Sequence, residues 1–73
     1  MPVKLLGGTM VYRLDNNLVL RINHYYVRRN PDLTASDVKF CKKEGEFYYF
    51  KLLNSDQEFG LLEDEVKRVI RIN

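Results

Sequence analysis

The amino-acid sequence predicts an all-β fold in one domain, residues 1–73. Three observations support this. Apolar and polar residues alternate with period two, clusters of turn-forming residues separate the alternating segments, and a run of aromatic residues favours strand structure. At 73 residues the chain has room for one thin core. About five short strands with tight connections are typical of a small barrel or a two-sheet sandwich.

The first hairpin is expected at residues 10–14 and 18–22. Apolar residues occupy every second position in both segments, as half-buried strands require. Between them lies Asp15-Asn16-Asn17, whose residue types tolerate positive φ and form Asx turns. Asn30-Pro31-Asp32 predicts the next turn, followed by a polar stretch through Asp37.

Residues 33–45 allow two interpretations. Thr34 with Asp37 is a candidate capping box, and Gly45 is a candidate C-terminal residue for a short helix. The favoured alternative is a hairpin with strands at residues 38–43 and 46–53 and a Glu44-Gly45 turn. The aromatic run Phe47-Tyr48-Tyr49-Phe50 supports it. In that register Phe40 faces Tyr49, Val38 faces Lys51 and Cys41 faces Tyr48.

The C-terminal part predicts a short strand at residues 59–62, one helical or 3₁₀ turn at 63–65 and a closing strand at 66–72. Glu63, Asp64 and Glu65 suit the start of a helical turn, where carboxylates meet the positive end of the backbone dipole. An acidic docking site for a basic partner is the alternative role for these three residues.

This order of elements, with its aromatic hairpin and the ending Phe59-Gly60-Leu61-Leu62-Glu63-Asp64-Glu65-Val66-Lys67-Arg68-Val69, resembles the SH3-like small barrel. In particular it resembles short SH3-like proteins of bacteria, phages and mobile elements, mostly of unassigned function. The resemblance covers residues 9–70 and implies a barrel of about five strands with one 3₁₀ or helical turn before the last. Asn23 stands where the family often has glycine. Because the chain has no Trp and no Ala-Leu-Tyr-Asp-Tyr-like stretch, binding of proline-rich peptides is not implied.

The formal net charge of +2 is unevenly distributed. Residues 1–30 carry +4, residues 31–66 carry −5 and the last seven residues carry +3. If strands from both ends of the chain pair, the two basic segments share a face that is able to steer a charged partner. The alternative is a chance clustering of charges on a small domain.

No motif for catalysis is present, and the protein is predicted not to be an enzyme and to need no cofactor. Cys41 and His24 are the only candidates for a catalytic dyad, and one Cys with one His is too few for a metal site. Cys41 is expected to be buried as a small hydrophobic residue. His24 is expected to lie on the surface, and a pH-sensing role is the alternative for it. With one cysteine and no apolar stretch long enough for a membrane span or signal peptide, a cytoplasmic location is expected.

Nine aromatic residues point to a binding surface. Adjacent strand residues face opposite sides, so only one of Tyr25 and Tyr26 lies in the core, and the same holds for Tyr48 and Tyr49. Outward tyrosines serve as a protein-binding hot spot, as a stacking platform for bases, or as a cover for apolar surface.

The sequence therefore predicts a non-catalytic binding module for another protein, with a regulatory or accessory role. The predicted site is formed by outward-facing Tyr26 and Tyr48, with Arg28 and Arg29 at its rim. If the strand register shifts by one residue, the neighbours of Tyr26 and Tyr48 replace these two tyrosines in the site. Nucleic-acid binding is the alternative, along a basic strip of Arg13, Arg21, Arg28, Arg29, Lys67, Arg68 and Arg71. A homodimer formed through an unclosed strand is a third hypothesis.

Overall fold

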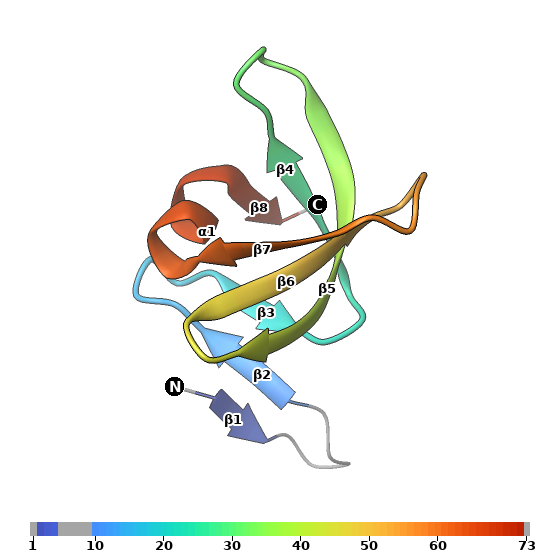
Figure 1. Ribbon diagram of the computed structural model, residues 1–73. Helices are drawn as coiled ribbons and strands as arrows, with labels where there is room; N and C mark the ends of the chain where they lie inside the picture. The colour runs from blue at the N-terminus through green and yellow to red at the C-terminus, as the bar shows by residue number, and fades with distance from the viewer. Residues whose placement is uncertain (1, 5–9, 73) are drawn as a thin grey trace.

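Eight strands form two antiparallel sheets in the computed structural model, which describes residues 2–4 and 10–72. The three-stranded sheet has the order β1-β2-β3, and the five-stranded sheet has the order β7-β6-β5-β4-β8 (Figure 1). The first comprises β1 (Pro2–Lys4), β2 (Met10–Arg13) and β3 (Val19–Arg21). The second comprises β4 (Tyr25–Arg29), β5 (Ala35–Glu44), β6 (Phe47–Leu52), β7 (Glu58–Leu62) and β8 (Ile70–Ile72), with helix α1 (Glu63–Val69) between the last two strands. The mostly β character predicted from the sequence is confirmed.

The β2–β3 hairpin forms as predicted. The Leu14 amide donates to the Leu18 carbonyl at 2.8 Å, and the Leu18 amide donates to Asn16 Oδ1 at 3.1 Å. Asn17 has a φ of 70°, which asparagine adopts more readily than most residues. These Asx-type contacts close the turn and direct Leu14, Leu18 and Leu20 into the core.

Residues 35–44 form a strand, so the helical alternative for residues 33–45 is wrong. Thr34 does not cap a helix, because its amide and hydroxyl both donate to Asp32 within the β4–β5 turn. Asp37 pairs with Val27 of β4 in the sheet. The resulting β4–β5 hairpin is long, and Figure 1 shows its tip projecting beyond the rest of the sheet.

The β5–β6 hairpin is confirmed, but its predicted register is wrong. The pairs are Val38↔Leu52, Phe40↔Phe50 and Lys43↔Tyr48, with a bulge between Phe40 and Lys42. The turn residues are Gly45 and Glu46, with Gly45 first at a φ of 61°, the place that a type II′ turn assigns to glycine. Cys41 is the extra residue of the bulge. The bulge reverses the alternation, so that Phe40 and Lys43 lie on the same side of β5.

The end of the chain has more helix and less strand than predicted. Helix α1 extends to Val69, and β8 keeps only three residues, Ile70–Ile72. Val66, Val69 and Ile70 recur at helical spacing and pack against the core, which favours the helix over a continuous strand. β8 pairs with β4, so a strand from the basic segment 1–30 lies beside the C-terminal strand.

One hydrophobic cluster lies between the two sheets and α1. The fully buried side chains at its centre are Leu20, Val38, Phe40, Phe50, Val66 and Ile70. Among residues 2–4 and 10–72, no strand pairing joins the two sheets, so a closed barrel is not formed there. The arrangement in the described residues is the two-sheet alternative, with β7 and β8 as the edges of the larger sheet.

Candidate functional site

Tyr26 and Tyr48, predicted to face outward, are buried, with exposed fractions of 5% and 4%. Tyr26 pairs with the buried Val38, and Tyr48 packs against the Phe40 ring. The Tyr48 hydroxyl donates to Glu63 Oε1 at 3.3 Å. The prediction that these two side chains form an exposed site is therefore wrong, because the register of each strand turns them toward the core.

Their sequence neighbours face outward instead. Phe47 is 43% exposed, and Tyr49 and Leu62 share the same outer face of the five-stranded sheet. The Phe47 and Tyr49 ring centroids lie 6.2 Å apart. We call Phe47, Tyr49 and Leu62 the aromatic patch. Alternation in the sequence groups Phe47 with Tyr49, but only the pairing with β7 shows which side of the sheet they occupy and adds Leu62.

The position of the Tyr49 ring is set by Gly60 of the neighbouring strand. Tyr49 and Gly60 are directly paired, and a Cβ added to Gly60 would lie 2.9 Å from Tyr49 Cε1. The Lys42 ammonium lies 5.3 Å from the centroid of the same ring. The ring therefore lies close to the glycine backbone and has a cation over its face.

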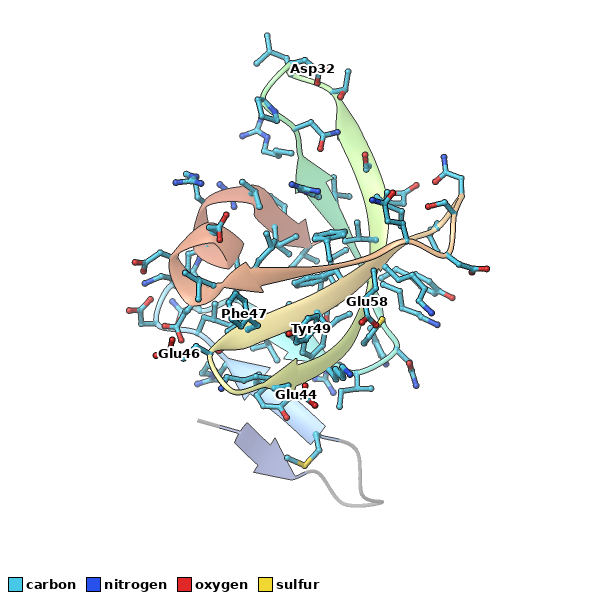
Figure 2. The ribbon with its side chains drawn as sticks, in the orientation of Figure 1. Asp32, Glu44, Glu46, Phe47, Tyr49 and Glu58 are labelled. Atoms are coloured by element: carbon cyan, nitrogen blue, oxygen red, sulfur yellow. The ribbon has the colours of Figure 1, made fainter. Side chains whose placement is uncertain are left out.

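Carboxylates surround the aromatic patch. Figure 2 shows Glu44 and Glu46 near the β5–β6 turn and Glu58 at the start of β7, around Phe47 and Tyr49. All three glutamates are exposed, and none forms an ion pair with another described residue. Lys39, Lys42 and Lys51 lie on the same face, with Lys51 directly opposite Glu58. The patch thus has an apolar centre and a charged rim that contains both acidic and basic residues.

β7, beside the aromatic patch, is an open edge of the sheet. The Leu52 amide donates to the carbonyl of Gln57, the residue before β7, at 3.2 Å. Because backbone groups alternate in direction along a strand, the amides and carbonyls of Phe59 and Leu61 also point toward β6. Those of Glu58, Gly60 and Leu62 therefore point away from it. Of these, the Leu62 amide donates to Glu65 Oε1 at 3.3 Å. The Leu62 carbonyl, at the N-cap of α1, accepts the first hydrogen bond of the helix. Among the residues described, the outward amides and carbonyls of Glu58 and Gly60 have no strand partner.

Arg28 and Arg29 lie away from the aromatic patch, in a groove of about 690 Å³. Arg28 has the same orientation on β4 as Tyr26, and its guanidinium carbon lies 4.5 Å from the Phe59 ring centroid. Arg68 of α1 lines the same groove. The other lining residues are Asn30, Pro31, Leu33, Thr34, Leu61, Glu65 and Val69. The groove is basic, with three arginines and one carboxylate.

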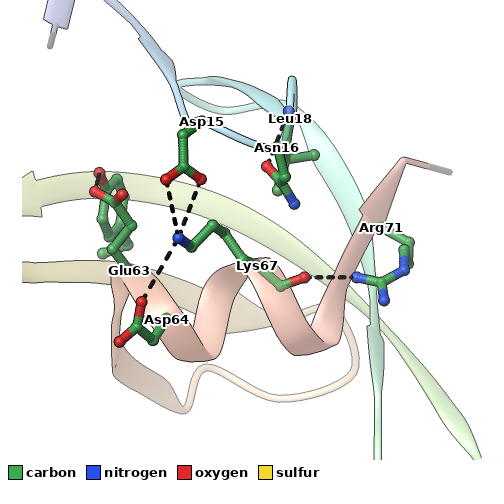
Figure 3. Close-up of polar contacts among 8 residues, drawn as sticks. Asp15, Asn16, Leu18, Glu63, Asp64, Lys67 and Arg71 are labelled. Carbon is green, nitrogen blue, oxygen red and sulfur yellow. Dashed lines mark hydrogen bonds and ion pairs between the residues drawn. The ribbon is translucent and has the colours of Figure 1, made fainter.

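The rest of the predicted basic strip is divided. Lys67 Nζ lies 3.0 Å from an Asp15 carboxylate oxygen and 3.6 Å from Asp64 Oδ1 (Figure 3). The hydrogen bond to Asp15 raises the pKa of Lys67, with the charges of the nearby acids adding to the effect. The Arg71 guanidinium donates to the carbonyls of Lys67 and Ile70. Arg13 and Arg21 belong to the separate three-stranded sheet.

Two other groups have shifted pKa values. Burial, together with the Glu63 carboxylate, raises the pKa of Tyr48 to about 12. The Thr34 hydroxyl, and then its amide, lower the pKa of Asp32 by donating hydrogen bonds to the carboxylate. Neither group lies on the aromatic patch or in the basic groove, and their shifts follow from core packing and from the turn.

Cys41 and His24, the two residues considered for a catalytic dyad, lie in the β5 bulge and between β3 and β4. Cys41 is half-buried in the β5 bulge rather than buried as expected, and its thiol lies 3.6 Å from the Lys39 carbonyl. His24 is exposed, as expected. Within the described ranges, no three His, Cys, Asp or Glu residues are grouped to hold a metal ion. In the same ranges no helix has the length and apolar character needed to cross a membrane.

The fold and these surfaces define a small, mostly β domain with an aromatic patch, rimmed by charged residues, beside an open strand and with a separate basic groove. No protein-family model matches the chain, and searches of curated proteins and of solved structures found no match.

Proposed function

We propose that this protein is a small, non-catalytic binding module whose partner is another protein. The observation that carries the proposal is the aromatic patch of Phe47, Tyr49 and Leu62 directly beside the open edge of β7. Aromatic residues supply much of the binding energy at protein interfaces. An apolar centre with a charged rim is the usual layout of such a surface.

The patch is also preorganised for binding. Tyr49 is fixed between the Gly60 backbone and the Lys42 ammonium, and Phe47 packs against its side. Side chains that are already ordered lose little rotamer entropy when a partner docks. This property favours recognition over the alternative in which the rings only cover apolar surface.

We further propose that the domain is an open variant of the SH3-like small barrel in a cytoplasmic protein with a regulatory or accessory role. The strand order supports the fold assignment: β4 to β7 form a meander, one short helix follows, and the last strand returns to pair with β4. A single cysteine, which has no intrachain disulfide partner, is consistent with a reducing compartment.

The test is capture of proteins from a nuclease-treated bacterial lysate by the tagged chain and its variants. We expect a defined protein to bind the wild type, and Phe47→Ala or Tyr49→Ala to weaken its binding by about tenfold or more. Tyr25→Ala is the matched control, because Tyr25 is an exposed aromatic residue of the same sheet outside the patch. If all three variants capture the protein equally, the patch is not the binding surface.

Nucleic-acid binding is the second candidate, supported by the convergence of Arg28, Arg29 and Arg68 on one groove. Arginine-lined grooves bind phosphates, and such binding weakens steeply with salt because counterions are released. We expect Arg29→Gln and Arg68→Gln to reduce binding to a duplex or single strand if this function exists. An absence of binding at low salt would exclude it.

A further inference from the structure

The open edge of β7 is a preformed template for one more strand. The amides and carbonyls of Glu58 and Gly60 point away from β6 and have no partner strand among the described residues. Gly60 has no side chain, and the template ends at Leu62, whose amide donates to Glu65 and whose carbonyl, at the N-cap of α1, accepts the first helical hydrogen bond. Unpaired edges of this kind pair readily with extended segments.

The aromatic patch lies where the side chains of an added strand would be placed. Glu58, Gly60 and Leu62 face the outer side of the sheet together with Phe47 and Tyr49. Every second residue of a strand added along β7 would therefore extend the outer face next to Leu62. Backbone pairing and apolar contact would then occur in the same binding event.

The charge of the segment around β7 indicates which kind of partner fits this edge. Residues 52–66 contain five acidic residues and no Lys or Arg. Three of the acids have partners inside the domain: Glu63 accepts from Tyr48, Glu65 from the Leu62 amide, and Asp64 pairs with Lys67. Asp56, Glu58, Glu44 and Glu46 form no ion pair among the described residues, although Lys51 lies directly opposite Glu58. The segment around β7 therefore keeps an excess of negative charge. A basic segment would complement these charges.

The same charges argue against a second copy of this chain at the edge. Antiparallel pairing of two β7 strands would bring two copies of the acidic segment 52–66 together. Juxtaposed like charges disfavour association. A homodimer through β7 is therefore disfavoured relative to pairing with a basic partner.

We propose that the partner of this domain contributes an extended, basic segment that pairs along β7 and completes the sheet next to the aromatic patch. This inference rests on the proposed protein-binding function and names the mode and the partner chemistry. Strand pairing protects the outward backbone amides of β7 from exchange with solvent. Docking on the face of the patch alone would not protect them.

The experiment uses peptides selected from a random library by the full-length protein. We expect the selected peptides to be basic, with apolar residues at alternate positions. The Gly60 and Glu58 amides should exchange with solvent at least about tenfold more slowly in the complex than in the free protein. Methylating alternate peptide amides along one edge should weaken binding by about tenfold or more, and methylating the other edge should have little effect.

Two variants of one residue separate backbone pairing from charge. Glu58→Pro removes an amide that points away from β6, so the pairing within the sheet can persist, as proline allows on an edge strand. Glu58→Gln removes the charge alone. We expect the proline variant to bind at least about fivefold more weakly than the glutamine variant. Unchanged exchange at Phe59 and Leu61 checks that β7 is still folded.

The outcomes distinguish this inference from the function on which it rests. Peptides that bind and are sensitive to Tyr49→Ala, but leave the Gly60 amide unprotected, would overturn strand pairing and keep the protein-binding function. Selection of acidic peptides would overturn the basic partner. If no peptide or protein binds at all, the proposed function itself fails.

Discussion

The Tyr26 hydroxyl accepts a hydrogen bond from the Arg21 amide at 2.7 Å and so connects the two sheets. It also lies 3.3 Å from the Val19 carbonyl, to which it donates. Tyr26 belongs to β4 and the two backbone groups belong to β3. One phenol thus satisfies edge groups of β3 that no neighbouring strand satisfies in the described part of the chain.

Removing this hydroxyl should loosen the contact between the sheets. Tyr26→Phe keeps the buried ring but leaves the Arg21 amide without its partner, which costs about 1–2 kcal/mol. Urea unfolding followed by circular dichroism measures the loss. Tyr25→Phe is the control and should change stability very little, because Tyr25 is 52% exposed. Equal stability of the two variants would show that the Tyr26 hydroxyl does not contribute.

Gly60 is required by the position of the Tyr49 ring. A methyl group at Gly60 would come within 2.9 Å of Tyr49 Cε1, so Gly60→Ala should destabilise the domain by about 1–3 kcal/mol. With Tyr49→Ala the space is free, and the same change at Gly60 should become neutral or stabilising, as alanine usually is relative to glycine in a strand. A double-mutant cycle measures this coupling. A penalty of the same size in both backgrounds would contradict it.

Leu33, at the tip of the β4–β5 hairpin, has an unfavourable backbone conformation. Its φ is 71°, a region that costs a leucine about 1 kcal/mol, and its side chain is 97% exposed. Leu33→Asn should therefore stabilise the domain by about 0.5–1 kcal/mol in thermal or urea unfolding. Leu53→Asn replaces another exposed leucine, one without positive φ, and should have almost no effect. A destabilised Leu33→Asn variant would show that the leucine makes a contribution of its own.

The Tyr48 phenol should make stability depend on alkaline pH. Its pKa is raised from 10.0 to about 12 in the folded state, so the folded protein holds the proton more tightly than the unfolded chain. The stability from this difference is complete below the unfolded pKa and is lost as the pH rises from 10 toward 12. Urea unfolding of wild type and Tyr48→Phe across that range measures it. The variant should show a smaller decline, and parallel curves would contradict the assignment.

Local residue patterns were sufficient to predict most elements of the fold. The β2–β3 turn follows from Asp15-Asn16-Asn17, in which the Asn16 side chain accepts from the Leu18 amide and Asn17 adopts a positive φ. The strands predicted at residues 38–43 and 46–53 from alternation and aromatic content are present, although β5 begins earlier, at Ala35, within the stretch that was expected to continue the turn. The helical turn predicted at residues 63–65 is present, but the extension of α1 to Val69 was not predicted, because a short apolar segment such as residues 66–70 fits a strand as well as a helix when no neighbouring element is known.

The candidate site was harder to predict than the fold. The sequence determined that Tyr48 and Tyr49 face opposite sides and that the chain has acidic and basic segments. The tertiary structure alone decided which tyrosine is exposed, because the Gly45 turn and the Cys41 bulge set the register of β5 against β6. It also decided that β7 is an open edge next to Phe47 and Tyr49, since strand order depends on long-range pairing that no local pattern encodes.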